Sequence, residues 1–319
     1  MVVKYILKGT FMEILLLAFL VILYTLQSLL TKLYTDKYPG DPGVASTVLT
    51  VVSGLSVAAV TFFGFSLCSF TLNWWSVIIG TLNAFALFGY NHFIVKSSQT
   101  GPYSVVMMFN LSGGIIIPII IALVVGWDAW EAIPEIIINV ISIAAIIGAV
   151  YMVSVRADEG EKSKASIPFM LSCFGLGICN GLYGTFLTLQ QRTSAAGGEV
   201  CRNEMIIVTF LVAAIISAVS GFLRQGRGFV RSFKQNKTSA LFLVATSLVF
   251  ALAINVVVII IPLIPTTILY TFDNSSVLIL SVLISWLFFR EKLSRLNVIG
   301  IAVMVSALTC MNLLPILLT

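Results

Sequence analysis

An aspartate within TILYTFDNSSVLIL (residues 267–280) stands where a membrane helix tolerates charge least. Asp273 follows Pro265 by eight residues, which at 1.5 Å per helical residue puts its carboxyl roughly 12 Å inside a bilayer. A carboxylate at the centre of such a helix costs about 2.5–3.5 kcal/mol on insertion scales, and desolvation favours the protonated acid until a cation arrives. This acid can therefore exchange a proton for a cationic or zwitterionic substrate. The alternative is a structural acid, hydrogen-bonded to Asn274 or a serine.

Other polar and aromatic side chains interrupt the apolar runs at similar depth. Asn110 follows Pro102 by the same eight residues. Polar atoms within a bilayer face protein or a water-filled cavity, so each such residue either lines a cavity or joins two helices. The predicted substrate-binding residues are Asp273, Asn110, Tyr270, Asn274, Tyr24, Gln27, Asn83, Tyr90, Asn91, Met107, Asn180, Tyr183 and Asn255, and Asp273 is also the candidate for coupling to protons.

Motifs for catalysis are absent from the sequence. It has no G-x-x-x-x-G-K-[ST] for a nucleotide, no H-E-x-x-H for zinc and no paired aspartates for a metal-held diphosphate. Its single histidine has no second histidine to work with. We therefore expect no enzymatic activity, no cofactor, no metal site and no nucleic-acid partner.

The elements that must position these residues are membrane helices. The chain is 59% hydrophobic and 10% charged, with a mean hydropathy of +1.07, whereas soluble domains are about a quarter charged. Continuous apolar runs of about 20 residues are long enough to cross a bilayer as helices, and they lack the alternation of a β-barrel. We expect an all-α membrane protein with ten spans, near 12–32, 44–65, 74–95, 102–125, 135–155, 167–190, 204–223, 238–260, 265–288 and 296–317.

Basic residues predict the orientation of these spans. The 18 Lys and Arg residues are divided unevenly, since only Lys4, Lys8, Arg192 and Arg202 lie on the side of the termini. The other fourteen lie in or beside the loops that follow the odd-numbered spans, and such an excess marks the cytoplasmic side. We expect a multi-pass protein of the cell (inner) membrane with both termini outside the cytoplasm.

A charged segment, RADEGEKSKAS (156–166), divides the chain into residues 1–155 and 167–319, each with five spans. An offset of 163 places Pro102 opposite Pro265 and Asn110 opposite Asp273 without a gap. A repeat with an odd number of spans enters the membrane from opposite sides in its two copies. The pattern therefore predicts two inverted five-helix repeats joined by a cytoplasmic linker, an arrangement that places a substrate site near the midplane between them.

Two glycine clusters bear on helix packing, and for Gly177 and Gly181 ordinary packing of small residues is the favoured interpretation. Gly177 and Gly181 form a G-x-x-x-G pair, which permits close approach of two helix backbones. Gly113 and Gly114 precede Pro118, a combination that favours a kink in the fourth span.

The C-terminal segment WLFFREKLSRLNVIGIAVMVSALTCMNL (286–313) is similar to the EamA branch of the drug/metabolite transporter superfamily. That family has a Gly-Glu-x-Leu-like turn after its ninth span. Arg290-Glu291-Lys292-Leu293 resembles this turn with Arg in place of Gly, and Ile299-Gly300-Ile301 resembles the start of the tenth span. The resemblance implies a carrier that works by alternating access, with a cavity lined by spans 1, 3, 4, 6, 8 and 9. It places Asn110, Tyr270 and Asp273 in that cavity.

We therefore expect a secondary active transporter for a small polar or zwitterionic metabolite, such as an amino acid or amine. Its partners would be the substrate, protons if transport is coupled, and the bilayer, with the chain a monomer or homodimer. Two alternatives stay open. One is an exporter of lipophilic or quaternary cations, and the other is a non-transporting membrane partner or lipid flippase subunit.

Overall fold

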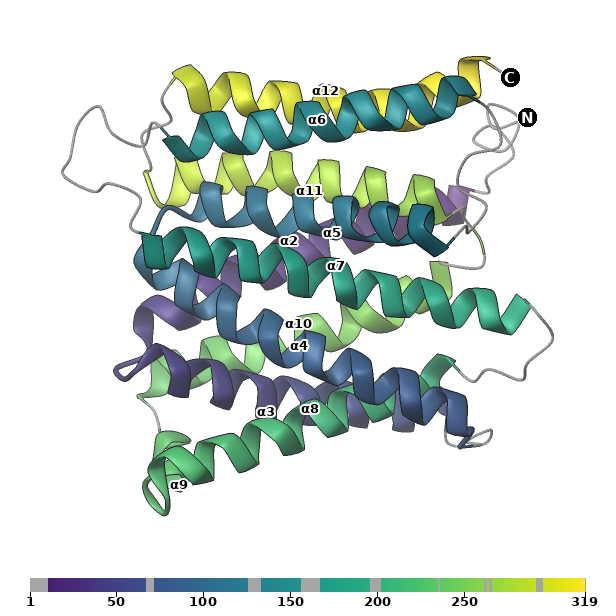
Figure 1. The fold of residues 1–319 in the computed structure, drawn as a ribbon. Helices are drawn as coiled ribbons and strands as arrows, with labels where there is room; N and C mark the ends of the chain where they lie inside the picture. Colours follow the sequence, from purple (N-terminus) through teal and green to yellow (C-terminus); the bar gives the residue numbers. More distant parts are fainter. Residues whose placement is uncertain are drawn as a thin grey trace.

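The computed structural model of the protein describes residues 11–66, 72–125, 133–155, 167–195, 202–234, 236–260, 263, 266–290 and 295–318. Within these residues the fold is all-α, and no β-strand occurs. The long helices run back and forth as one bundle, with α6 and α12 along one edge and α3 and α8 along the opposite edge (Figure 1).

Ten of the described helices contain 20 to 29 residues. In chain order the described elements are α2 (Phe11–Lys37), α3 (Pro42–Thr61), a π-helical turn η1 (Phe62–Ser66), α4 (Trp74–Thr100), α5 (Tyr103–Val125), α6 (Ile133–Val155), α7 (Ile167–Ala195), α8 (Arg202–Gln225), the short α9 (Gly228–Ser232), α10 (Lys237–Ile260), α11 (Thr266–Phe288) and α12 (Arg295–Leu318).

Six of the described helices are long and apolar enough to cross a membrane, namely α2, α3, α4, α7, α8 and α10. The other four long helices have shorter described apolar stretches, at Tyr103–Pro118, Val140–Ala149, Phe272–Phe288 and Val298–Met311. Large apolar side chains cover the outside of the bundle, including Ile22, Phe85, Leu171 and Leu241. An apolar exterior on apolar helices indicates a membrane protein.

Local chemistry sets several helix ends. Asp41 caps α3, since its Oδ1 accepts a hydrogen bond from Gly43 N at 2.7 Å and Pro42 occupies the first turn. Asn73 caps α4 in the same way by accepting from Trp75 N at 2.9 Å. Gly226 ends α8 with a φ of 54°, a left-handed conformation that glycine adopts without strain. These caps satisfy backbone groups that the helix ends leave unpaired.

The turn after α11 contains the one other described residue with positive φ. Arg290 has a φ of 52°, in the left-handed region that costs an L-residue with a side chain roughly 1–2 kcal/mol. This backbone conformation favours glycine, so the arginine at this position is strained. Glu291, Lys292 and Leu293 lie outside the described residues, as does the predicted linker 156–166.

Glycines allow helices from the two halves of the chain to touch backbone to backbone. A Cβ on Gly177 of α7 would lie 2.8 Å from Phe109 O of α5, and a Cβ on Gly113 of α5 would overlap the backbone of Gly177. Gly181 meets Gly113 O and Ile117 at the same crossing. The close approach predicted from G-x-x-x-G is therefore confirmed. Pro118 lies inside α5, as the sequence placed it.

Candidate functional site

A pocket lies among six helices at the centre of the bundle: α2, α4, α5, α7, α10 and α11. Its cavity volume is about 100 Å³. The empty space around it, including the part open to solvent, is about 850 Å³. It is lined by Tyr24, Gln27, Ser28, Leu87, Tyr90, Met107, Asn110, Leu111, Gly114, Asn180, Tyr183, Gly184, Leu187, Phe250, Ile254, Val257, Asp273, Asn274 and Val277.

Nine of the thirteen predicted binding residues are in this lining: Tyr24, Gln27, Tyr90, Met107, Asn110, Asn180, Tyr183, Asp273 and Asn274. The lining helices also correspond to predicted spans 1, 3, 4, 6, 8 and 9. The structure thus brings together residues from distant parts of the chain that were selected by polarity and depth. Their role in binding a substrate stays a prediction.

Asp273 carries the only ionisable group of the described lining apart from tyrosine hydroxyls, since no Lys, Arg or His lines the pocket. The residue is 8% exposed, and its Oδ1 has no hydrogen-bond partner among the described residues. A buried carboxyl oxygen without a donor is costly unless a cation, a proton or water reaches it. The pocket therefore contains one acid that a cation, a proton or water can compensate.

Asn110 and Asp273 line the same pocket, and their helices α5 and α11 pack against each other. Asn180 of α7 donates from Nδ2 to Asn110 O at 2.8 Å, which fixes the Asn180 amide at the wall of the pocket. The Tyr90 hydroxyl faces the side chains of Asn110 and Gln27. Among the described residues, Asn110 Oδ1 has no hydrogen bond of normal geometry, so this buried acceptor is also available to a ligand.

Gly114 keeps the wall open beside these amides. A Cβ at this position would lie 2.7 Å from Asn180 Nδ2 and 3.7 Å from Asn274 Oδ1. A distance under 3.0 Å to a held amide is too short for a real side chain, so only glycine leaves Asn180 where it is. The absence of a side chain at Gly114 therefore leaves space for the side-chain amides of Asn180 and Asn274.

Four predicted residues do not contribute a described side chain to the lining. Asn255 instead joins α10 to α3, because its Nδ2 donates to Thr61 Oγ1 at 3.1 Å and to Ala251 O at 2.8 Å. This is the interhelical hydrogen bond that the sequence left open as the alternative. The side chain of Tyr270 lies outside the described part of the chain, although its backbone belongs to α11.

Asn83 and Asn91 are buried in α4 outside the lining. Asn83 is 0% exposed, and neither polar atom of its amide has a hydrogen-bond partner in the described residues. Gly80, three residues earlier on the same face, packs against Met205 and Val208 of α8. Asn83 thus faces the interface between α4 and α8 rather than the pocket.

Polarity alone missed the apolar part of the lining. Phe250, Ile254 and Val257 contribute from one face of α10, and Val277 follows Asp273 by one helical turn. Gly114 follows Asn110 by the same interval. Helical spacing from the polar residues is the signal that finds Gly114 and Val277. The lining residues of α10 are all apolar, so no polar residue in the described lining identifies this face from the sequence.

Comparisons with known proteins bear on the fold alone. No family model and no curated protein matches this chain. One solved structure, described only as "Crystal structure of protein", is similar over 95% of this chain and 97% of its own, with a TM-score of 0.59 and 16% sequence identity. At that identity the likeness shows a shared fold.

Proposed function

We propose that this protein is a secondary active transporter that moves a small amine or zwitterionic metabolite across the cell membrane by alternating access. The observation that carries the proposal is Asp273, a buried acid with an unpartnered oxygen in a pocket between helices of both halves of the chain. A structural acid would have its hydrogen-bond donors in the protein. An acid that must exchange cations keeps at least one oxygen free for them, as Oδ1 of Asp273 is among the described residues.

The proposal includes ten membrane crossings in two inverted halves. Exchange of the halves pairs α2 with α7, α3 with α8, α4 with α10, α5 with α11 and α6 with α12. Under this exchange the contact of α2 with α10 becomes that of α7 with α4, and the contact of α5 with α7 becomes that of α11 with α2. The contact of α4 with α8 becomes that of α10 with α3, while α3–α8, α5–α11 and α6–α12 map onto themselves. This pattern supports a twofold relation between the halves.

The basic loops support the predicted orientation. A Cβ on Gly43, at the start of α3, would lie 3.3 Å from Arg224 Nη1 at the end of α8. Lys32, near the end of α2, donates to Ser98 O near the end of α4. These ends of α2, α4 and α8 therefore lie together, and the excess of basic residues would make this the cytoplasmic end.

The lining supports a substrate with one cationic group. Asp273 would take the substrate ammonium or the coupling proton, and a charge in the membrane interior is tolerated best as a pair. The side-chain amides of Gln27, Asn110, Asn180 and Asn274 would orient the polar end of the substrate. A phosphate or dicarboxylate would find no basic side chain in the described lining.

A transport assay tests this role of Asp273. Proteoliposomes that contain the Asp273→Asn variant should lose pH-dependent uptake of an amine or amino acid, because the variant cannot exchange a proton for the substrate. Glu13→Gln, the same chemical change at the start of α2, is the matched control and should retain the wild-type pH profile. An unchanged pH profile in Asp273→Asn would remove this acid from the mechanism.

The apolar half of the pocket favours one second candidate, export of lipophilic or quaternary cations. Leu87, Leu187 and Phe250 lie in the same lining as the tyrosines, and cations bind favourably over aromatic faces. A thermal-unfolding screen of amino acids against quaternary amines separates the candidates, because only a bound ligand stabilises the folded protein. A non-transporting partner or flippase subunit would not need this pocket.

A further inference from the structure

Beyond the pocket, toward the C-terminal end of α2, successive polar contacts join α2 to its neighbours. The first lies directly at the lining, where Ser28 Oγ and Tyr103 OH are 2.6 Å apart. Tyr103, the first residue of α5, is 1% exposed, and its ring packs on Phe289 at 5.4 Å between centroids. This contact joins α2 to the first residue of α5 directly at the pocket lining.

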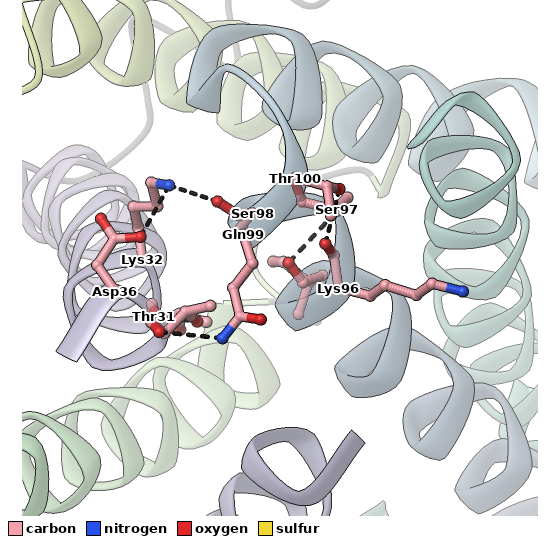
Figure 2. A network of polar contacts seen from close by, with 10 residues as sticks. Thr31, Lys32, Asp36, Lys96, Ser97, Ser98, Gln99 and Thr100 are labelled. Atoms are coloured by element: carbon pink, nitrogen blue, oxygen red, sulfur yellow. Dashed lines mark hydrogen bonds and ion pairs between the residues drawn. The ribbon is translucent and has the colours of Figure 1, made fainter. Parts of the chain in front are cut away.

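The second layer lies one turn farther, about 6 Å along α2. Lys32 is 12% exposed on its side chain, and its Nζ donates to Ser98 O of α4 and pairs with Asp36 Oδ1 at 3.0 Å (Figure 2). The ammonium also lies 5.9 Å from the centroid of the Phe289 ring, which follows α11. One side chain thus contacts residues from α4 and from the end of α11.

A third contact lies nearly one more turn along α2. Gln99 Nε2 donates to Thr35 O at 3.1 Å, which joins α4 to α2 again. The three layers together connect α2 with α4, α5 and the end of α11. Those four helices all line the pocket.

The chemistry of the Lys32 layer suits a contact that breaks and reforms. Ser98 lies in the last turn of α4, where a carbonyl has no partner within the helix, and the negative end of the helix dipole attracts a cation. If α2 moves away, that carbonyl can bind water. Asp36 is on α2 itself, four residues from Lys32, so the ion pair travels with the helix and keeps the ammonium compensated in both positions.

From this geometry we propose that Lys32 is the positioning residue of a gate that is closed in this structure, and that its contact with Ser98 holds the pocket shut from the end where α2 and α4 finish. The inference rests on the proposed function, because a gate has meaning only for a pocket that opens alternately to two sides. Lys32 is not a residue of the pocket lining, so its proposed role is to control access to the pocket and not to bind the substrate.

Accessibility of a pocket thiol tests the gate without any substrate. The background replaces the five native cysteines (Cys68, Cys173, Cys179, Cys201 and Cys310) and adds Val277→Cys as a reporter in the lining. Labelling by a membrane-impermeant maleimide is measured in right-side-out and inside-out vesicles. From the face next to the end of α2, Lys32→Met should raise the labelling rate about tenfold, which corresponds to about 1.4 kcal/mol of gate stability.

Lys96→Met is the matched control. Lys96 lies two residues before Ser98 on α4, and its ammonium points away from Lys32 and Asp36 (Figure 2). This control should leave the labelling rate within about twofold of the background, well below the tenfold step of the gate variant. Equal rates in Lys32→Met and the background would overturn the gate. An equal rise in Lys96→Met would also overturn it, because loosening of the fold would then explain both.

Gln99→Met provides a second test if Lys32→Met does not yield folded protein, since it removes the Gln99–Thr35 contact without uncovering a charge. It is judged by the same two criteria. Failure of the gate and failure of the transporter stay distinguishable. Labelling reports the gate alone, whereas loss of uptake for every amine tested would refute transport and leave the labelling result standing.

Discussion

A methyl group added at Gly114 should lower substrate affinity with little change in the free energy of unfolding. In Gly114→Ala, the new Cβ would lie 2.7 Å from Asn180 Nδ2, too close for Asn180 to stay in place. Asn180 must therefore swing away, and its 2.8 Å hydrogen bond to Asn110 O breaks. The substitution moves one of the amide donors of the proposed site and adds a methyl group beside Asn274.

Two opposing terms determine the stability of this variant. The lost hydrogen bond costs about 0.5–1.5 kcal/mol, while alanine in place of glycine inside a helix gains about 0.5–1 kcal/mol. The free energy of unfolding should therefore stay within about 1 kcal/mol of wild type. Substrate affinity should fall about tenfold, since a displaced donor removes a hydrogen bond worth about 1.4 kcal/mol.

Gly148→Ala in α6 is the matched control, because a Cβ there meets no atom within 4 Å. It should raise the free energy of unfolding by about 0.5–1 kcal/mol and leave uptake kinetics alone. Thermal unfolding of the purified protein measures the stability, and the concentration dependence of amine uptake into proteoliposomes measures KM. If Gly114→Ala keeps the wild-type KM, Asn180 and Gly114 do not shape the substrate site, and the reasoning from this pocket wall is refuted.

Three further outcomes are expected. The double variant Asp273→Asn/Asn110→Asp should recover pH-dependent uptake to within about tenfold of wild type, because both positions face one pocket; no recovery over Asp273→Asn would contradict their equivalence. Asn255→Leu should lower the free energy of unfolding by about 0.6–1.7 kcal/mol, the range for an interhelical hydrogen bond, with unchanged KM; a raised KM would return Asn255 to the site. Arg290→Gly should raise the free energy of unfolding by about 0.5–1 kcal/mol by relieving the positive φ, and a lower value measured by chemical denaturation would show that the turn is not strained.

Helices were predictable from apolar runs, but their ends follow hydrogen bonding. The third span was expected at 74–95, whereas α4 continues to Thr100, and the Ser97 and Thr100 hydroxyls there find acceptors in carbonyls one turn back. Hydropathy falls there although the backbone remains helical. The π-helical turn η1 and the short α9 were not predicted, since a local shift of hydrogen-bond register and a single turn inside a basic loop have no apolar period.

The site was predictable where the bilayer restricts polar atoms. Asp273, Asn110 and Asn180 are identifiable because lipid leaves polar groups only protein or a cavity to face. Asn255 has the same type and depth yet bonds to Thr61, and nothing in the sequence shows which neighbour a buried amide will meet. Whether a buried amide joins two helices or lines the pocket depends on helix packing, which is set by contacts between residues far apart in sequence.

The glycine crossing of α5 and α7 has a consequence for how the molecule can move. Backbones that touch at Gly113 and Gly177 leave no side chains to slide past each other, so this crossing would serve as a pivot between α5 and α7. A rotation about it would separate the two helices at one membrane face and bring them together at the other. Asn180 and Asn110 lie about one turn from that pivot, so the hydrogen bond between them would persist during such a rotation while the open end of the pocket changed sides.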